Sequence, residues 1–151
     1  MMRYNDITAQ YQRKSSGTII SFHGGSLTEQ RRYIWNMLGS VQDLCLYIDW
    51  EDQFSKYTPP PHYTHVLCVS VAHRQQIASI IEIVQTHIDI NTIVLDPFQE
   101  IDAIPIGWMY SSITDLVRKY KFTLYLLFDP EHKPLFQAQV YIDLRRCPIR
   151  F

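Results

Sequence analysis

The residues that come closest to a site for chemistry are 21–32, SFHGGSLTEQRR, where Gly24 and Gly25 follow an apolar run. A strand, a glycine turn and a helix N-terminus can bind a phosphate, because backbone N–H groups there point at the anion. A nucleotide-hydrolysing loop also needs G-x-x-x-x-G-K-[ST], in which lysine neutralises the phosphates and the hydroxyl holds magnesium. That lysine is missing after Gly25, and Glu29 adds negative charge to the first turn.

The same stretch has a structural interpretation. Ser26 and Glu29 have the S-x-x-E spacing of a capping box, which predicts a helix start. Asp96 ends an apolar run before Pro97, where a magnesium-organising aspartate would stand, but a strand-end residue explains it equally well. We therefore expect an ordinary turn and no nucleotide hydrolysis.

Other reactive side chains do not form a recognisable site. Asp49, Glu51 and Asp52 predict a solvated acidic loop, and His62 and His65 lack a third metal ligand. No G-x-S-x-G motif occurs, and no CxxC joins the three cysteines, of which Cys45 and Cys68 are expected in the core. We predict no catalytic, cofactor-binding or metal-binding residues and no enzymatic activity.

A candidate recognition surface comes from aromatic residues around three consecutive prolines, since tryptophan and tyrosine often anchor interfaces. Its predicted partner-binding residues are Trp50, Phe54, Tyr57 and Tyr63. An alternative is that these rings fold back as a lid on the core. Arg31 and Arg32 could add a basic patch for DNA or an acidic partner, or they could simply face solvent.

The elements that would position these residues alternate between strands and helices. Gly39 is predicted to end the first helix, and residues 98–110 are predicted to be a loop because of Pro105 and Gly107. Expected strands cover residues 17–22, 43–49, 65–71, 91–96, 122–128 and 136–144, and expected helices cover 26–39, 77–88 and 113–120. This order predicts a mainly parallel α/β sheet with helices on both faces and a C-terminal β-hairpin.

Length and composition agree with one folded domain. The chain has 151 residues, 46% hydrophobic and 19% charged, with a formal net charge of −1. The charge does not favour nucleic-acid binding, and no apolar run is long enough to span a membrane. We expect a flexible arm at residues 1–16, one domain at 17–151, and a cytoplasmic location.

The order of elements resembles the recombinase (RecA-like) core. DLCLYIDWEDQF is similar to its second strand and acidic exit, and QQIASIIEIVQTHIDINTIVLDP to its helix and aspartate-ended strand. SSITDLVRKYKFTLYLLFDP followed by YIDLRR is similar to its terminal helix, strand and hairpin. The resemblance covers roughly residues 17–146 and implies a RecA-like fold whose phosphate loop is lost.

A short RecA-like chain without that loop resembles the SulA-type cell-division inhibitors. The resemblance implies a non-enzymatic protein of the SOS response to DNA damage that binds the division GTPase FtsZ and blocks its polymerisation. Two alternatives stay open: a recombinase paralogue or mutasome accessory protein that binds a recombinase or polymerase in DNA repair, and a nucleotide-binding enzyme with a degenerate loop. Homodimer formation also stays open.

Overall fold

The computed structural model describes residues 17–49, 63–70, 76–97, 106–130 and 138–145, and the account below concerns these. They form one six-stranded sheet in the order β3-β2-β4-β5-β1-β6, and every pair of neighbouring strands is parallel. The strands are β1 (Thr18–His23), β2 (Cys45–Asp49), β3 (Val66–Ser70), β4 (Thr92–Asp96), β5 (Thr123–Leu126) and β6 (Val140–Asp143). The predicted mainly parallel α/β sheet is confirmed.

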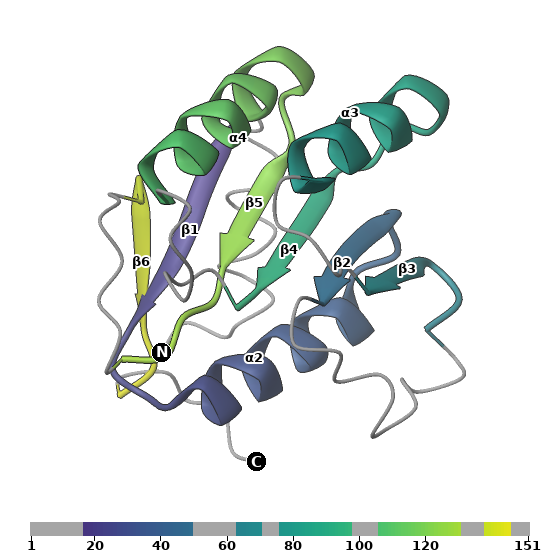
Figure 1. Cartoon of the computed structure of the whole chain (residues 1–151). Coiled ribbons are helices and arrows are strands. Elements are labelled where there is room, and N and C mark those ends of the chain that lie inside the picture. Colours follow the sequence, from purple (N-terminus) through teal and green to yellow (C-terminus); the bar gives the residue numbers. More distant parts are fainter. Residues whose placement is uncertain (1–16, 50–62, 71–75, 98–105, 131–137, 146–151) are drawn as a thin grey trace.

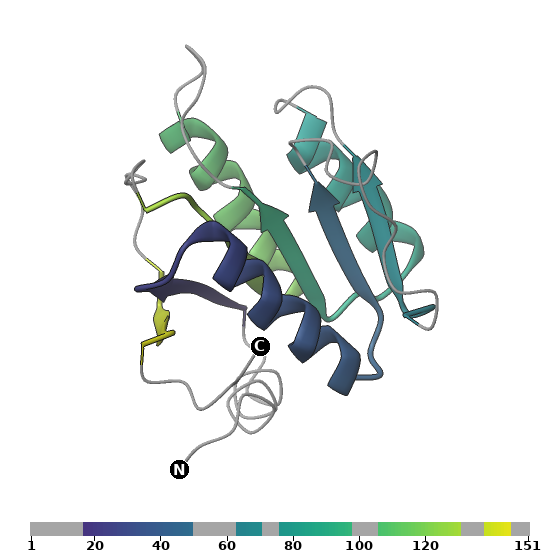
Figure 2. The ribbon, with the colours of Figure 1, turned by 90° about the horizontal axis from the view of Figure 1, so that it is seen from below.

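Helices cover both faces of the sheet (Figures 1 and 2). Helix α2 (Leu27–Ser40) lies on one face, and α3 (Ile77–His87) and α4 (Ile106–Tyr120) lie side by side on the other. Each face has its own apolar core, with Ile34 and Leu38 of α2 on one side and Ile77 and Ile81 of α3 on the other. Strands β2 and β4 are buried at every position, as their nearly continuous apolar sequences predict.

The predicted C-terminal hairpin is wrong. Strand β6 pairs in parallel with β1, Ile20 opposite Val140, and it does not pair with β5. The turn residues Asp129 and Pro130 suggested a hairpin, but both edges of β5 are already occupied by β4 and β1. A returning strand therefore had no edge of β5 to join.

Two helix boundaries also differ from the prediction. Helix α2 continues through Gly39 to Ser40, and Val41 is its C-cap residue. Gly39 therefore does not end the helix; it leaves space for the Tyr63 side chain, which a Cβ at this position would contact. Helix α4 begins at Ile106, within the predicted loop, so that Gly107 lies in its first turn. A proline is tolerated at a helix start, so a proline in the sequence does not by itself predict that the residues after it form a loop.

Candidate functional site

The glycine turn connects β1 to α2 at the carboxyl end of the sheet. Only Gly24, Gly25 and the N-cap Ser26 separate His23 from Leu27, whereas the phosphate-loop motif extends over eight residues. Both glycines have positive φ, 68° and 81°. This turn is too short to wrap a chain of phosphates.

Side chains from the end of β6 cover the turn. A Cβ on Gly24 would come within 2.7 Å of Arg145 Cγ, and one on Gly25 within 2.7 Å of Leu144 Cδ1. Arg145 is held in place by Asp143, whose Oδ1 lies 3.1 Å from Arg145 Nε, and this hydrogen bond raises the pKa of Arg145. The space against the glycines is thus filled by the protein itself.

The first turn of α2 uses its amide groups internally. The Glu29 N–H donates to Ser26 Oγ at 3.2 Å, and the Ser26 N–H donates to Glu29 Oε1 at 3.2 Å. These reciprocal bonds confirm the predicted capping box. A phosphate would have to compete with them and with the charge of Glu29.

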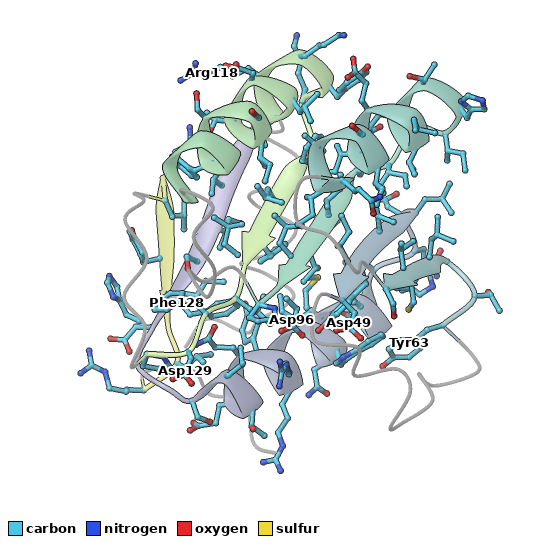
Figure 3. All side chains as sticks on the ribbon, in the orientation of Figure 1. Asp49, Tyr63, Asp96, Arg118, Phe128 and Asp129 are labelled. Atoms are coloured by element: carbon cyan, nitrogen blue, oxygen red, sulfur yellow. The ribbon has the colours of Figure 1, made fainter. Side chains whose placement is uncertain are left out.

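An acidic pair lies at the carboxyl ends of two adjacent strands. Asp49 of β2 and Asp96 of β4 are register partners, both are fully buried, and Figure 3 shows them side by side. Arg31 of α2 places its Nε 2.9 Å from Oδ2 and 3.1 Å from Oδ1 of Asp96. The Tyr47 hydroxyl also donates to Asp96. The charge of Asp96 is therefore paired with the guanidinium of Arg31, at the strand end where the sequence suggested either a magnesium-organising aspartate or an ordinary strand-end residue.

Gln30 of α2 forms two hydrogen bonds with the backbone that follows β5. The Gln30 Nε2 donates to the Phe128 carbonyl at 2.9 Å, and the Phe128 N–H donates to Gln30 Oε1 at 3.1 Å. Gln30 is only 1% exposed, so both bonds are shielded from water. Sequence reasoning missed Gln30, because it lies in the polar run TEQRR and only the tertiary fold turns it inward.

Aromatic rings extend from the acidic pair toward β3. Trp35 stacks on Tyr47 with centroids 4.9 Å apart, and the Tyr63 ring lies 5.8 Å from Trp35. The Tyr63 hydroxyl donates to the Trp35 carbonyl at 3.1 Å. Next to it, His65 Nε2 lies 2.7 Å from the Leu38 carbonyl. Trp35 was not among the predicted residues; its place in α2, between the core positions Ile34 and Met37, gave no signal for a surface role.

The predicted partner-binding residues fall into three groups. Tyr63 packs on α2, as the lid interpretation expected for that one ring, and it stays partly exposed. Arg31 turns inward onto Asp96 and is 21% exposed, whereas Arg32 is exposed on α2. Trp50, Phe54 and Tyr57 lie outside the described residues.

The cysteines and other potential ligands are not arranged for chemistry in the part of the chain that the structure describes. Burial, and secondarily the charge of Asp43, raises the pKa of the Cys45 thiol to about 12. Burial and the charge of Asp49 raise that of Cys68 to about 11. Within the same residues no group of three His, Cys, Asp or Glu side chains could hold a metal ion, and no helix is long and apolar enough to cross a membrane.

Comparison with solved structures identifies the architecture. The chain is similar to the crystal structure of the RadB recombinase, with a TM-score of 0.54 and 11% sequence identity, over 73% of this chain and 60% of that one. The fold is RecA-like. The chain thus matches only 60% of the length of this recombinase, and at this identity the likeness establishes the fold alone. No protein-family model matches the sequence, and no curated protein is significantly similar to it.

Proposed function

We propose that this RecA-like domain acts by binding another protein and not by hydrolysing a nucleotide. The observation that carries the proposal is the contact between Arg31 and Asp96, with Nε 2.9 Å from Oδ2 of a fully buried carboxylate. In RecA-like nucleotide hydrolysis an aspartate at this position organises magnesium. Here an internal cation neutralises it, and the turn beside it is covered by Leu144 and Arg145.

The partner that we propose is the division GTPase FtsZ, as for the SulA-type inhibitors that the order of elements resembles. Such a function requires a rigid surface and no catalysis, so a glycine turn that cannot bind a phosphate would not impair it. The protein would occupy one end of an FtsZ subunit and withdraw that subunit from polymerisation. This would occur during the SOS response to DNA damage.

The proposed contact residues are Tyr63 and Arg32, and we add Trp50, Phe54 and Tyr57 because they belong to the aromatic segment that precedes Tyr63 in the sequence. Tyr63 is already fixed by its bond to the Trp35 carbonyl, so less side-chain entropy would be lost on binding. Residues 50–62 leave β2 at Asp49 and return at Tyr63, so the structure defines where both ends of this segment are attached.

Sedimentation of FtsZ polymers in the presence of GTP tests this proposal. An equimolar amount of the protein should shift FtsZ from the pellet to the supernatant. Trp50→Ala and Arg32→Glu should weaken the effect at least tenfold, whereas Arg118→Glu, at an exposed arginine on α4 that lies far from Tyr63 in Figure 3, should not. Unchanged polymer at equimolar protein would reject FtsZ as the partner.

A second candidate is an accessory protein of DNA repair that binds a recombinase or polymerase. The order of elements that resembles the recombinase core is what suggests it. Co-purification of the tagged protein with a recombinase, and not with FtsZ, would support it.

The remaining alternative is an enzyme with a degenerate nucleotide site. Titration calorimetry with ATP or GTP and magnesium should show no binding, because Arg31 is paired with Asp96 and the glycine turn has no lysine after Gly25. Measurable binding that Asp96→Ala weakens would revive this alternative and contradict the proposed function.

A further inference from the structure

Tyr47 lies between the buried Asp96 and the partly exposed aromatic rings. It is the third residue of β2, is fully buried, and is the register partner of Val94 on β4. Because side chains two positions apart on a strand point to the same face, Asp96 lies diagonally across from Tyr47 on the face that α2 covers. The Tyr47 hydroxyl donates to Asp96 Oδ2 on this face.

Asp96 thereby joins three elements of the fold. It belongs to β4, it accepts the Tyr47 hydroxyl from β2, and it accepts Arg31 Nε from α2, which lies 2.9 Å from Oδ2 and 3.1 Å from Oδ1. Hydrogen bonds to a carboxylate are stronger than those between neutral groups, and water does not compete with them in a fully buried site. These bonds therefore hold the Tyr47 side chain in one orientation.

The Tyr47 ring supports Trp35, which lies one helical turn after Arg31 on α2. The two rings stack with centroids 4.9 Å apart and an angle of 18° between their planes. Residues four positions apart lie on the same side of a helix, so Arg31 and Trp35 both face this part of the sheet. Trp35 is only partly buried, and the ring of Tyr47 is the surface on which its inner face rests.

Trp35 in turn supports Tyr63. The Tyr63 hydroxyl donates to the Trp35 carbonyl at 3.1 Å, and the two ring centroids are 5.8 Å apart. Both side chains are partly exposed, whereas Tyr47 and Asp96 are fully buried. A continuous series of contacts thus connects a buried carboxylate to a tyrosine that solvent can reach.

We propose that Tyr47 is a positioning residue for partner binding, which uses Asp96 to fix Trp35 and, through Trp35, Tyr63. This inference rests on the proposed function, in which Tyr63 contacts the partner. Asp96 then contributes to recognition of a protein without binding a nucleotide or a metal ion. The alternative is that the Tyr47 hydroxyl only satisfies a buried polar group, as buried tyrosines usually do, and that its removal leaves Trp35 in place.

Acrylamide quenching of fluorescence tests the positioning in the free protein. Trp50→Phe and Trp108→Phe leave Trp35 as the only tryptophan. In that background Tyr47→Phe should raise the quenching constant about twofold, because a less restrained Trp35 side chain is reached more often by the quencher within nanoseconds. Tyr33→Phe is the matched control, since it removes a hydroxyl from an equally buried tyrosine of the same core. It should leave quenching unchanged, and both variants should keep the circular dichroism of the parent.

Sedimentation of FtsZ polymers measures the consequence for binding, in the chain that retains all its tryptophans. About threefold more Tyr47→Phe protein than wild type should be needed to release half of the FtsZ, as expected for the loss of one hydrogen bond of moderate strength. Tyr33→Phe should act like the wild type. In a Tyr63→Ala protein, Tyr47→Phe should cause no further loss, because its effect passes through Tyr63.

The outcomes separate this inference from the proposed function. If the wild type leaves FtsZ polymers intact while Tyr47→Phe still raises the quenching of Trp35, FtsZ is rejected as the partner and the positioning of Trp35 by Tyr47 is supported. Equal quenching in Tyr47→Phe and Tyr33→Phe would overturn the inference. So would a wild type that inhibits FtsZ no better than Tyr47→Phe does, provided that the wild type inhibits it.

Discussion

At the residue scale, Arg31 supplies the positive charge beside the fully buried carboxylate of Asp96. Replacing it with alanine leaves a buried negative charge with one less partner. We expect Arg31→Ala to lower the free energy of unfolding by about 3 kcal/mol, the lower end for a broken buried pair, because the Arg31 side chain is 21% exposed. Urea denaturation followed by circular dichroism measures it.

Arg32→Ala is the matched control, since this neighbour is exposed on the same helix turn. It should change the free energy of unfolding by no more than about 0.5 kcal/mol. Equal effects of the two substitutions would show that Arg31 contributes as an ordinary surface residue.

The Cys45 thiol predicts a dependence of stability on alkaline pH. Its pKa rises from 9.0 to about 12 in the folded protein, chiefly through burial, so folding favours the protonated form. The stabilisation is complete below pH 9 and is lost as the pH rises toward 12. At pH 10 the loss should be about 1.4 kcal/mol, one pH unit of linkage.

Urea denaturation of the wild type and of Cys45→Ala at pH 8 and pH 10 isolates this group from the tyrosines, which titrate in both proteins. The free energy of unfolding of the wild type minus that of Cys45→Ala should be about 1.4 kcal/mol smaller at pH 10 than at pH 8. A difference that stays constant between the two pH values would contradict the prediction.

At the element scale, Gly39 and Tyr63 determine how the segment before β3 sits on α2. Alanine normally stabilises a helix interior relative to glycine, by about 0.5–1 kcal/mol. Here a Cβ on Gly39 would collide with the Tyr63 hydroxyl, which is itself bonded to the Trp35 carbonyl. Gly39→Ala should therefore destabilise the wild type by about 1 kcal/mol, from overpacking.

In a Tyr63→Ala background the sign should reverse, and Gly39→Ala should stabilise the protein by about 0.5 kcal/mol. A double-mutant cycle in urea measures this coupling. Independent, additive effects would mean that Tyr63 does not rest on the helix in solution.

The elements also show how far the sequence determines this structure. The apolar runs and the Ser26–Glu29 spacing sufficed for the strands and for the start of α2, because both signals are local. The strand with which β6 pairs depends on which strand edges are still unpaired in the assembled sheet, and the local sequence does not contain this information. The contact between Arg31 and Asp96 joins residues 65 positions apart, so nothing in either local sequence predicts it. For the same reason the inward turn of Gln30 was missed.

At the scale of the whole molecule, burial across the sheet predicts a gradient of hydrogen exchange. Strands β2, β4 and β5 are buried at every position, whereas every residue of β3 is only partly buried or exposed. Amides of the three central strands should exchange only on global unfolding, and those of β3 by local opening.

Hydrogen exchange followed by mass spectrometry measures this gradient. Peptides that contain β3 should exchange earlier than peptides that contain β4. Protection of β3 equal to that of β4 would contradict the predicted gradient.

The position of β1 between β5 and β6 has a consequence for synthesis on the ribosome. Ser21 bonds to the Leu126 carbonyl 105 residues later, and Ile19 bonds to Gln139 120 residues later. At about 5–20 residues per second, β1 waits on the order of 5–20 s for its first neighbour. Throughout that time β1 is an apolar segment whose partner strands β5 and β6 have not been made. Interrupted translation before β5 would therefore release an aggregation-prone fragment.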